Sequence, residues 1–252
     1  MLGTARWGSF IDQPAAYEML DKYTEMGGKL IDTATNYPIN AISSDLGLAI
    51  KWLSIWISRN PGINMEIFVK VGASDNSGSA AVDLTPNHLN MACSNLSGLL
   101  NQNLMGIGIH WDNRGETRIE QKAIEKSCEA LYSIEAQGFK IGLSGIINKK
   151  AYSKLLREYE DNLIIQIKET ITDQNSRLEY QPYFSKSQYY AYGISGNKHY
   201  GGNQRNKEKY DHSITRILKR RGISGVIIGP RNVSQLENSM VMLNSLIQNS
   251  PD

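Results

Sequence analysis

The feature that most constrains this chain is an alternation of short apolar runs with longer amphipathic stretches, repeated eight times along its length. Nearly continuous apolar runs of this kind are typical of parallel strands that helices cover on both sides. Strands are predicted at residues 2–5, 30–32, 67–71, 107–110, 140–144, 163–166, 189–192 and 225–228. Helices are predicted between and after them, at about residues 14–26, 44–60, 85–100, 119–137, 149–159, 176–187, 206–221 and 234–248.

Glycines mark several joints between a helix and the strand that follows it. Gly27, Gly138 and Gly222 each stand just before a predicted strand, where a helix commonly ends on a left-handed glycine. No Gly/Ser-rich linker divides the 252 residues, so we expect a single domain over residues 1–252. Eight strand–helix units in about 250 residues favour an α/β fold of the (β/α)8 TIM-barrel type. The alternative is a doubly wound sheet, but the segment after the first strand lacks its glycine-rich fingerprint.

The composition excludes several classes of function. With 27 basic and 25 acidic residues the net charge is +2, which gives no electrostatic reason to bind nucleic acid. The two cysteines, Cys93 and Cys128, stand in predicted helices without metal-binding spacing, as buried thiols of a reducing compartment do. The first residues do not form a signal peptide, and no apolar run approaches the roughly 18 residues of a membrane span. We therefore expect a cytoplasmic protein without a membrane partner.

Polar side chains stand at the ends of three consecutive predicted strands and in one of the loops that follow. Asp32 ends the second strand, Tyr37 lies in the loop after it, Lys70 lies in the third strand, and His110 ends the fourth. In a barrel of parallel strands, these carboxyl ends meet at one mouth, where active sites form. Each residue alone has an ordinary structural explanation: the acid could cap a helix, the lysine could point outward to solvent, and the histidine could belong to the core. Their conjunction on neighbouring strands indicates a catalytic site.

The chemistry of these four side chains is complementary. A phenol has a pKa of about 10, and a nearby ammonium is expected to lower it by stabilising the phenolate. A carboxylate paired with the ammonium would hold it in place, so Asp32 and Lys70 are expected to tune Tyr37 as a proton donor. A histidine across the site can orient a carbonyl oxygen by a hydrogen bond. Such a site suits protonation of a carbonyl oxygen while hydride arrives at the carbon.

The same residues carry a resemblance to a known family. The motifs are Gly3-Thr4-Ala5, Ile31 through Tyr37, Val69-Lys70, Ile109-His110, Ile141 through Ser144, Gln166, Ala191-Tyr192-Gly193, and Ile228 through Asn238. In this order and at barrel spacing, running nearly end to end, they make the chain similar to the aldo/keto reductases.

The resemblance implies a role for each of the four residues. The family residue matching Tyr37 is the general acid/base, those matching Asp32 and Lys70 tune it, and the one matching His110 orients the substrate carbonyl. The implied activity is NAD(P)H-dependent reduction of an aldehyde or ketone, with NADPH favoured over NADH and no metal. Trp111, next to His110, is expected to form a wall of the pocket for a small-molecule carbonyl substrate.

The resemblance also implies where the cofactor binds. Tyr192 would stack on the nicotinamide, and Ser144 and Gln166 would hydrogen-bond its carboxamide. Arg231 is the natural partner for a 2′-phosphate, because a guanidinium binds phosphate bidentately. The expected cofactor-binding residues are Gly3, Thr4, Ala5, Asp32, Ser144, Gln166, Tyr192, Gly193, Ile194, Gly229, Arg231, Asn232, Gln235 and Asn238.

The chain departs from the family pattern at a few positions. Pro38 replaces the usual glycine after the tyrosine, and a backbone fixed there could turn Tyr37 away from the mouth. Gly145 replaces an asparagine after Ser144, which removes one amide contact. The usual asparagine of the last segment falls on Ser239, one residue beyond Asn238. The chain also starts directly at the first strand, without the hairpin that closes the barrel floor in many members.

Polar residues in two loops give a weak indication of the substrate. Asn36, Asn40, Asn113 and Arg114 suggest a hydroxylated or anionic carbonyl compound, such as a keto sugar or its nucleotide conjugate. Two other functions remain open on the same residues. Lys70 could form a Schiff base in an aldolase-type barrel, or the chain could be a regulatory subunit that senses a nucleotide. A metal-dependent hydrolase is disfavoured because the other three histidines, His88, His199 and His212, do not stand at strand ends.

Overall fold

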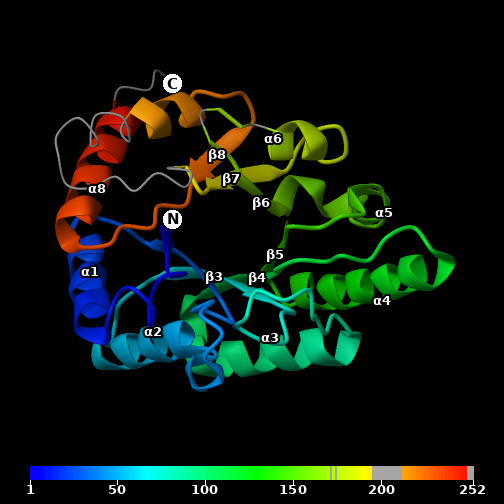
Figure 1. Cartoon of the computed structure of the whole chain (residues 1–252), viewed down its shortest axis with the longest axis horizontal. Coiled ribbons are helices and arrows are strands. Elements are labelled where there is room, and N and C mark those ends of the chain that lie inside the picture. Colours follow the sequence, from blue (N-terminus) through cyan, green and yellow to red (C-terminus); the bar gives the residue numbers. More distant parts are fainter. Residues whose placement is uncertain (171, 174, 195–211, 249–252) are drawn as a thin grey trace.

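The computed structural model describes residues 1–170, 172–173, 175–194 and 212–248. Within them, eight parallel strands form one sheet in the order in which they occur in the chain (Figure 1). The strands are β1 (Leu2–Gly3), β2 (Leu30–Ala34), β3 (Glu66–Val71), β4 (Leu104–Ile109), β5 (Lys140–Ser144), β6 (Ile164–Lys168), β7 (Gln188–Tyr192) and β8 (Ile223–Val226). Each strand is hydrogen-bonded to the next one along the chain.

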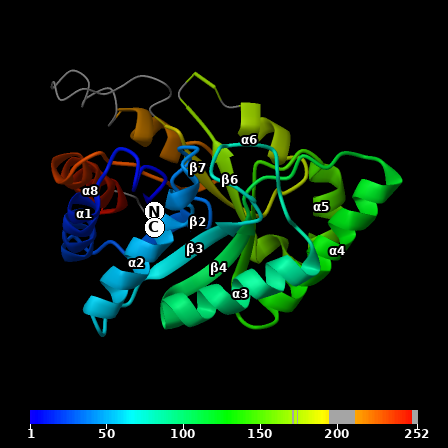
Figure 2. The ribbon, with the colours of Figure 1, turned by 60° about the horizontal axis from the view of Figure 1, so that its bottom comes forward.

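The described helices alternate with the strands and lie outside the sheet (Figures 1 and 2). They are α1 (Gln13–Glu25), α2 (Leu48–Arg59), α3 (Pro86–Leu100), α4 (Arg118–Glu135), α5 (Lys149–Leu155), α6 (Asn175–Tyr180) and α8 (Val233–Gln248), and residues 212–218 form a further helix. Short 3₁₀ helices cover Ser43–Asp45, Asn101–Asn103 and Arg157–Asn162.

The two edges of the sheet meet through the segment that follows β8. The Gly3 amide donates to the Ile228 carbonyl at 2.8 Å, and the Ile228 amide donates to the Met1 carbonyl at 3.0 Å. An isolated parallel bridge between Leu2 and Ile228 belongs to the same contact. The sheet thus closes on itself, and the predicted (β/α)8 fold is confirmed.

Local sequence signals set several helix boundaries. Asp12 caps α1 by accepting from the Ala15 amide, and Thr85 caps α3 by accepting from the His88 amide. Thr117 and Glu120 form a reciprocal capping box at the start of α4. The glycines predicted at the joints between helix and strand lie in the left-handed region, with φ values of +82° at Gly27, +92° at Gly138 and +86° at Gly222. Gly27 directly follows the C-cap residue of α1, whereas Gly138 and Gly222 stand in the turns that follow α4 and the helix at residues 212–218.

Two predicted helix boundaries were wrong. The helix predicted from about residue 44 begins at Leu48, because Ser43 and Ser44 lie in a separate 3₁₀ turn and Gly47, with φ +77°, stands at the N-cap. The helix predicted to reach residue 159 ends at Leu155 and passes into a 3₁₀ helix. The start of the helix predicted from residue 206, and most of the segment between it and the seventh strand, lie outside the described residues.

Phe68 fills the interior of the barrel next to two glycines of the neighbouring strands. A Cβ atom at Gly108 would lie 2.6 Å from Phe68 Cζ, and one at Gly142 would lie 2.7 Å from the same atom. Side chains alternate between the two faces of a strand, so residues two positions beyond these also face inward. This places Lys70, His110 and Ser144 inside the barrel, at its carboxyl-terminal mouth.

Candidate active site

Asp32 lies at the centre of the polar contacts in the mouth. Lys70 Nζ lies 2.5 Å from Asp32 Oδ1, and Gln166 Nε2 donates to the same oxygen at 2.6 Å. All three side chains are buried, and β2, β3 and β6 each supply one of them. A carboxylate at this depth requires such donors, because an unpaired buried charge is costly. The expected pairing of Asp32 with Lys70 is present, and Gln166 joins it.

Tyr37 faces this ion pair from the loop after β2. Its ring centroid lies 5.2 Å from Lys70 Nζ and 5.4 Å from the His110 ring, at an interplanar angle of 79°. The side chain is 7% exposed, and its hydroxyl forms no hydrogen bond with any described residue. The Tyr37–Pro38 peptide bond is cis, and the tyrosine still faces the mouth. The tetrad expected from the sequence is therefore assembled despite Pro38.

The electrostatics of Tyr37 differ from the expectation. Burial raises the pKa of its hydroxyl well above 10, and the charge of Asp32 acts in the same direction. The expected lowering of this pKa by the Lys70 ammonium is not found, because burial and the charge of Asp32 outweigh it. Burial lowers the pKa of Lys70 itself, against the opposing effect of Asp32. Tyr37 is accordingly a fully protonated phenol at neutral pH.

His110 is a neutral imidazole with an unused nitrogen. Burial, reinforced by the positive charge of Lys70, lowers its pKa well below 6.5. Its Nδ1 atom is buried and has no hydrogen-bond partner among the described residues. Trp111 packs on the imidazole with centroids 4.0 Å apart, and its buried indole nitrogen also lacks a partner there. Orphaned buried polar atoms are uncommon, and here two of them stand together at the mouth.

The residues expected at the nicotinamide lie on three neighbouring strands. Ser144 pairs in register with Gln166 between β5 and β6, and Tyr192 ends β7. Tyr192 is near enough to Asp32 and Tyr37 for their charges to interact, and burial raises its pKa. Gln166 uses its amide nitrogen on Asp32, while no described residue donates to its Oε1. An acceptor, a hydroxyl and an aromatic ring therefore face one side of the mouth.

The segment expected at the adenosine phosphates begins α8. Asn232 Oδ1 accepts from the Gln235 amide at 2.9 Å, and Gln235 Oε1 accepts from the Arg231 amide at 3.0 Å. These side-chain oxygens thus stabilise the helix N-terminus. Ser239 is buried and donates to the Gln235 carbonyl at 2.9 Å, whereas Asn238 is partly exposed. Of these two, Asn238 is the residue left available to a ligand.

The remaining expected cofactor residues differ in exposure. Thr4 is fully buried and donates to the Thr33 hydroxyl at 2.8 Å, while Ala5 is exposed at the end of β1. Gly193 and Gly229 are exposed, and Ile194 is buried. A Cβ at Gly3 would lie 2.9 Å from the Ile227 side chain, so close packing of β1 accounts for this glycine.

Three of the loop polar residues are engaged inside the protein. Arg114 forms a bidentate pair with Asp112, and Asn40 bonds to Asp45 and Asn76. Asn36 donates to the Asp75 carbonyl, although its own Oδ1 is buried and unpartnered. These contacts remove most of the basis for the hydroxylated or anionic substrate suggested by the loops.

Sequence reasoning missed Asp112. It is 1% exposed and stands two residues beyond His110, with Arg114 a further two residues along the chain. The sequence did contain a signal for this pair, which is an acid and an arginine two and four residues after the histidine that follows β4.

Among the described residues, no group of three His, Cys, Asp or Glu side chains could hold a metal ion. Among the described helices, none is long and apolar enough for a membrane span.

Comparisons with known proteins agree with this geometry. The model of the aldo/keto reductase family matches residues 1–180. PA4992 from Pseudomonas aeruginosa, assigned as an aldo-keto reductase, superposes with a TM-score of 0.72 at 20% identity, over 98% of this chain and 89% of that one. The holo form of aldo-keto reductase AKR11C1 from Bacillus halodurans gives 0.68 at 16% identity, over 100% and 87%.

These structural matches establish the likeness of fold, and the family model adds the likeness of sequence. No curated protein gives a significant sequence match. The family match covers more than half of the 252 residues and includes Asp32, Tyr37, Lys70 and His110. The chain therefore belongs to the aldo/keto reductase family, and it is an oxidoreductase.

Proposed function

We propose that this enzyme reduces an aldehyde or ketone to the alcohol with NADPH, and that Tyr37 donates the proton. The observation that carries the proposal is the Tyr37 hydroxyl, which bonds to no described residue and belongs to a ring that lies near both Lys70 of the ion pair and the neutral His110. A protonated phenol and a neutral imidazole are the states that a carbonyl reductase requires at neutral pH.

The residues in the mouth fit a nicotinamide cofactor. A carboxamide has one acceptor and two N–H donors, which match the Ser144 hydroxyl and the available Oε1 atom of Gln166. Tyr192, on the adjacent strand, offers a ring face for stacking. Bound NADPH would supply a hydride to the carbonyl carbon. Asp32 would act here as well, through the hydrogen bond that orients Gln166.

The protein's own residues account for the other half of the reduction. His110 holds the carbonyl oxygen by a hydrogen bond, so that the oxygen also faces the Tyr37 hydroxyl. Tyr37 then gives up its O–H proton to the oxygen, which becomes the alcohol hydroxyl. Lys70, 5.2 Å from the ring, stabilises the phenolate left behind. Asp32 keeps Lys70 charged and in place within the barrel.

The preference for NADPH over NADH is assigned to Arg231. This residue is exposed immediately before α8, where its side chain can reach a phosphate near the helix N-terminus. Asn238, partly exposed one and a half turns into α8, would contact the adenine. Gly229 leaves open space at the approach to this site, since no atom of the described residues lies within 4 Å of the position of a Cβ there.

Trp111 is assigned to the substrate pocket. Its indole packs on His110 and is partly exposed, so it can form a wall of the pocket beside the carbonyl. Because Arg114 and Asn40 are engaged elsewhere, the pocket has less polar character than the loop sequences suggest. Aliphatic and aromatic aldehydes therefore belong in the assay together with free and nucleotide-linked keto sugars.

The proposal is tested by following NADPH oxidation over that panel of carbonyl compounds. Turnover of at least one compound is expected, with loss of absorbance matched by formation of the alcohol. Binding of NADPH without turnover of any carbonyl would favour the regulatory-subunit alternative. Borohydride trapping tests the aldolase alternative, because a covalent adduct on Lys70 would overturn the reductase mechanism.

A further inference from the structure

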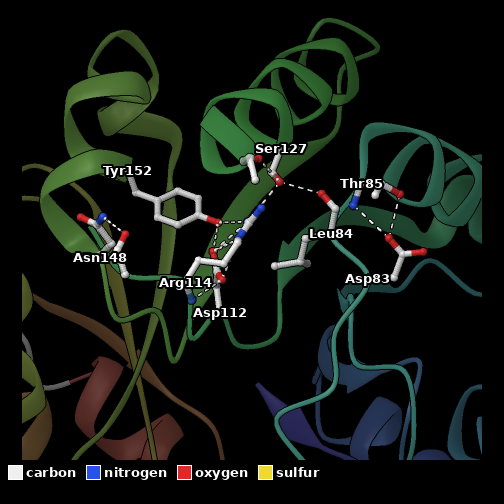
Figure 3. A network of polar contacts seen from close by, with 10 residues as sticks. Asp83, Leu84, Thr85, Asp112, Arg114, Ser127, Asn148 and Tyr152 are labelled. Carbon is white, nitrogen blue, oxygen red and sulfur yellow. Dashed lines mark hydrogen bonds and ion pairs between the residues drawn. The ribbon is translucent and has the colours of Figure 1, made fainter. Parts of the chain in front are cut away.

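Behind His110 lies a buried ion pair that the reaction itself does not use. The Arg114 Nε atom lies 2.9 Å from Asp112 Oδ1 and its Nη2 atom lies 2.8 Å from Oδ2 (Figure 3). The Arg114 backbone amide donates to Oδ1 at 2.9 Å, and the Tyr152 hydroxyl donates to Oδ2 at 2.6 Å. The Asp112 carboxylate thus accepts hydrogen bonds from four different donor groups. Tyr152, which donates one of them, stands on α5, and Ser127 of α4 contacts Arg114.

From Arg114, contacts lead back to the backbone of His110. Arg114 Nη2 donates to the Ser127 hydroxyl at 3.1 Å, and this hydroxyl donates to the Leu84 carbonyl at 2.6 Å (Figure 3). The Leu84 side chain covers Gly72, where a Cβ would lie 2.3 Å from Leu84 Cδ2.

Gly72 completes the return path to the catalytic strand end. The residue before it, Val71, accepts a hydrogen bond from the His110 amide at 2.9 Å. A closed ring of contacts therefore starts at the end of β3 and passes through His110, Asp112, Arg114, Ser127 and Leu84. The imidazole projects from this ring into the mouth, while the ion pair lies on the opposite side of the same segment.

The same segment is joined to the strand that carries Ser144. The Asp112 amide donates to the Gly145 carbonyl at 3.3 Å, and the Asp112 carbonyl accepts from the Ile147 amide at 2.9 Å. Gly145 has φ +65°, and a Cβ there would lie 3.4 Å from the His110 carbonyl oxygen and 3.4 Å from Trp111 Cβ. These contacts join the segment from His110 to Asp112 to the end of β5, which carries Ser144.

We propose that Arg114 is a positioning residue for catalysis: through Asp112 and Ser127 it fixes the His110 imidazole relative to Tyr37 and the nicotinamide site. The inference rests on the proposed reductase function. A buried ion pair is weak evidence for stability, because desolvation offsets much of its attraction. Its position in the ring gives it a geometric role instead. A displacement of about 1 Å at a reacting group can cost about 100-fold in rate.

Two substitutions weaken the ring, and a third is a matched control. Arg114→Ala removes the guanidinium, and Ser127→Ala removes the hydroxyl between Arg114 and Leu84. Ser133→Ala is the control, because Ser133 lies on the same helix and its hydroxyl also donates to the carbonyl four residues earlier, but it is exposed and outside the ring. Arg114→Ala should lower kcat about 10- to 100-fold, and Ser127→Ala by a smaller factor. Ser133→Ala should leave kcat unchanged.

Two further measurements separate positioning from a loss of folding. NADPH affinity should stay within about twofold of the wild type in both ring variants, and millimolar guanidinium should restore part of the Arg114→Ala rate. The imidazole ¹H–¹⁵N correlations of His110, assigned among the four histidines by His110→Asn, should shift in both ring variants and not in Ser133→Ala.

The imidazole signals keep the inference testable apart from the proposed function. If the wild-type protein reduces no carbonyl compound, the proposed function fails, while the signals still report whether Arg114 positions His110. If Arg114→Ala does not fold, Ser127→Ala carries the test. A lower melting temperature with wild-type kcat and wild-type His110 signals would overturn the inference and leave the pair a structural one.

Discussion

The Lys70 ammonium lies 2.5 Å from the Asp32 carboxylate inside the barrel, where the two side chains are 3% and 6% exposed. Each charge makes the burial of the other possible. The nearby tyrosine stays protonated, because burial and the charge of Asp32 both raise the pKa of its phenol. This arrangement keeps a cation ready beside Tyr37 without ionising it before the substrate arrives.

A double-mutant cycle measures the dependence of these two charges on one another. Lys70→Met and Asp32→Asn should each lower the free energy of unfolding by about 3–5 kcal/mol, because each leaves one buried charge without its partner. In the double variant the free energy of unfolding should fall by less than the sum of the two single decreases, since neither charge remains. Denaturant unfolding of the four proteins provides the measurement. Additive losses would mean that the ion pair is not coupled in solution.

Tyr37→Phe should separate activity from stability. The hydroxyl has no hydrogen-bond partner among the described residues, so its removal should change the free energy of unfolding by less than about 1 kcal/mol. The rate of carbonyl reduction should fall by a factor of about 10² to 10⁴ or more, because the proton donor is gone. NADPH fluorescence should show nearly unchanged binding. Retention of full activity would rule out Tyr37 as the donor.

The pH dependence follows from the two shifted groups. The pKa of His110 is lowered below 6.5, so the imidazole stays neutral until the pH falls well below that value. The pKa of Tyr37 is raised above 10, so the phenol keeps its proton throughout the neutral range. We therefore expect kcat for reduction to be flat from about pH 6.5 to 9. A steady loss of rate from pH 7 to 9 would mean that a proton is lost more easily than expected from Tyr37, or from Lys70, whose pKa burial lowers.

The sequence was sufficient to predict the barrel and the four mouth residues for a physical reason. Both depend on local patterns, which are the apolar period of the strands and the polar residue at each strand end. The pKa of Tyr37 could not be predicted in this way. It depends on how deeply the phenol is buried and on how closely Asp32 approaches Lys70, and both are outcomes of packing.

The loop residues show the same limit. Arg114 is of a residue type that often binds anionic substrates. It pairs instead with Asp112, which is two positions away in sequence and is buried near Ser127 and Tyr152. The helix predicted from about residue 44 begins only at Leu48, because the chain makes a separate 3₁₀ turn before α2. Such outcomes are decided by contacts across loops that no short pattern contains.

Two glycine substitutions should have opposite effects on stability. Nothing lies within 4 Å of a Cβ at Gly138 or at Gly98, so neither substitution to alanine creates a clash. Gly138→Ala should lower the free energy of unfolding by about 1 kcal/mol, because φ is +92° there. Gly98→Ala, in α3, should raise it by about 0.5–1 kcal/mol, because alanine favours the helix. Equal effects would contradict the left-handed conformation of Gly138 in the turn after α4.

Arg231→Ala tests the assignment of the 2′-phosphate site. NADPH and NADH differ only in that phosphate, so loss of a charge-assisted contact should weaken NADPH by about 10- to 100-fold and leave NADH nearly unchanged. Arg157→Ala is the control, because Arg157 is also an exposed arginine but lies just before β6, at the amino-terminal end of the barrel. It should affect neither cofactor. Fluorescence titration of both variants with both cofactors gives the four affinities needed. An equal loss for NADPH and NADH on Arg231→Ala would show that Arg231 contacts a part common to both, and another residue would then have to account for any NADPH preference.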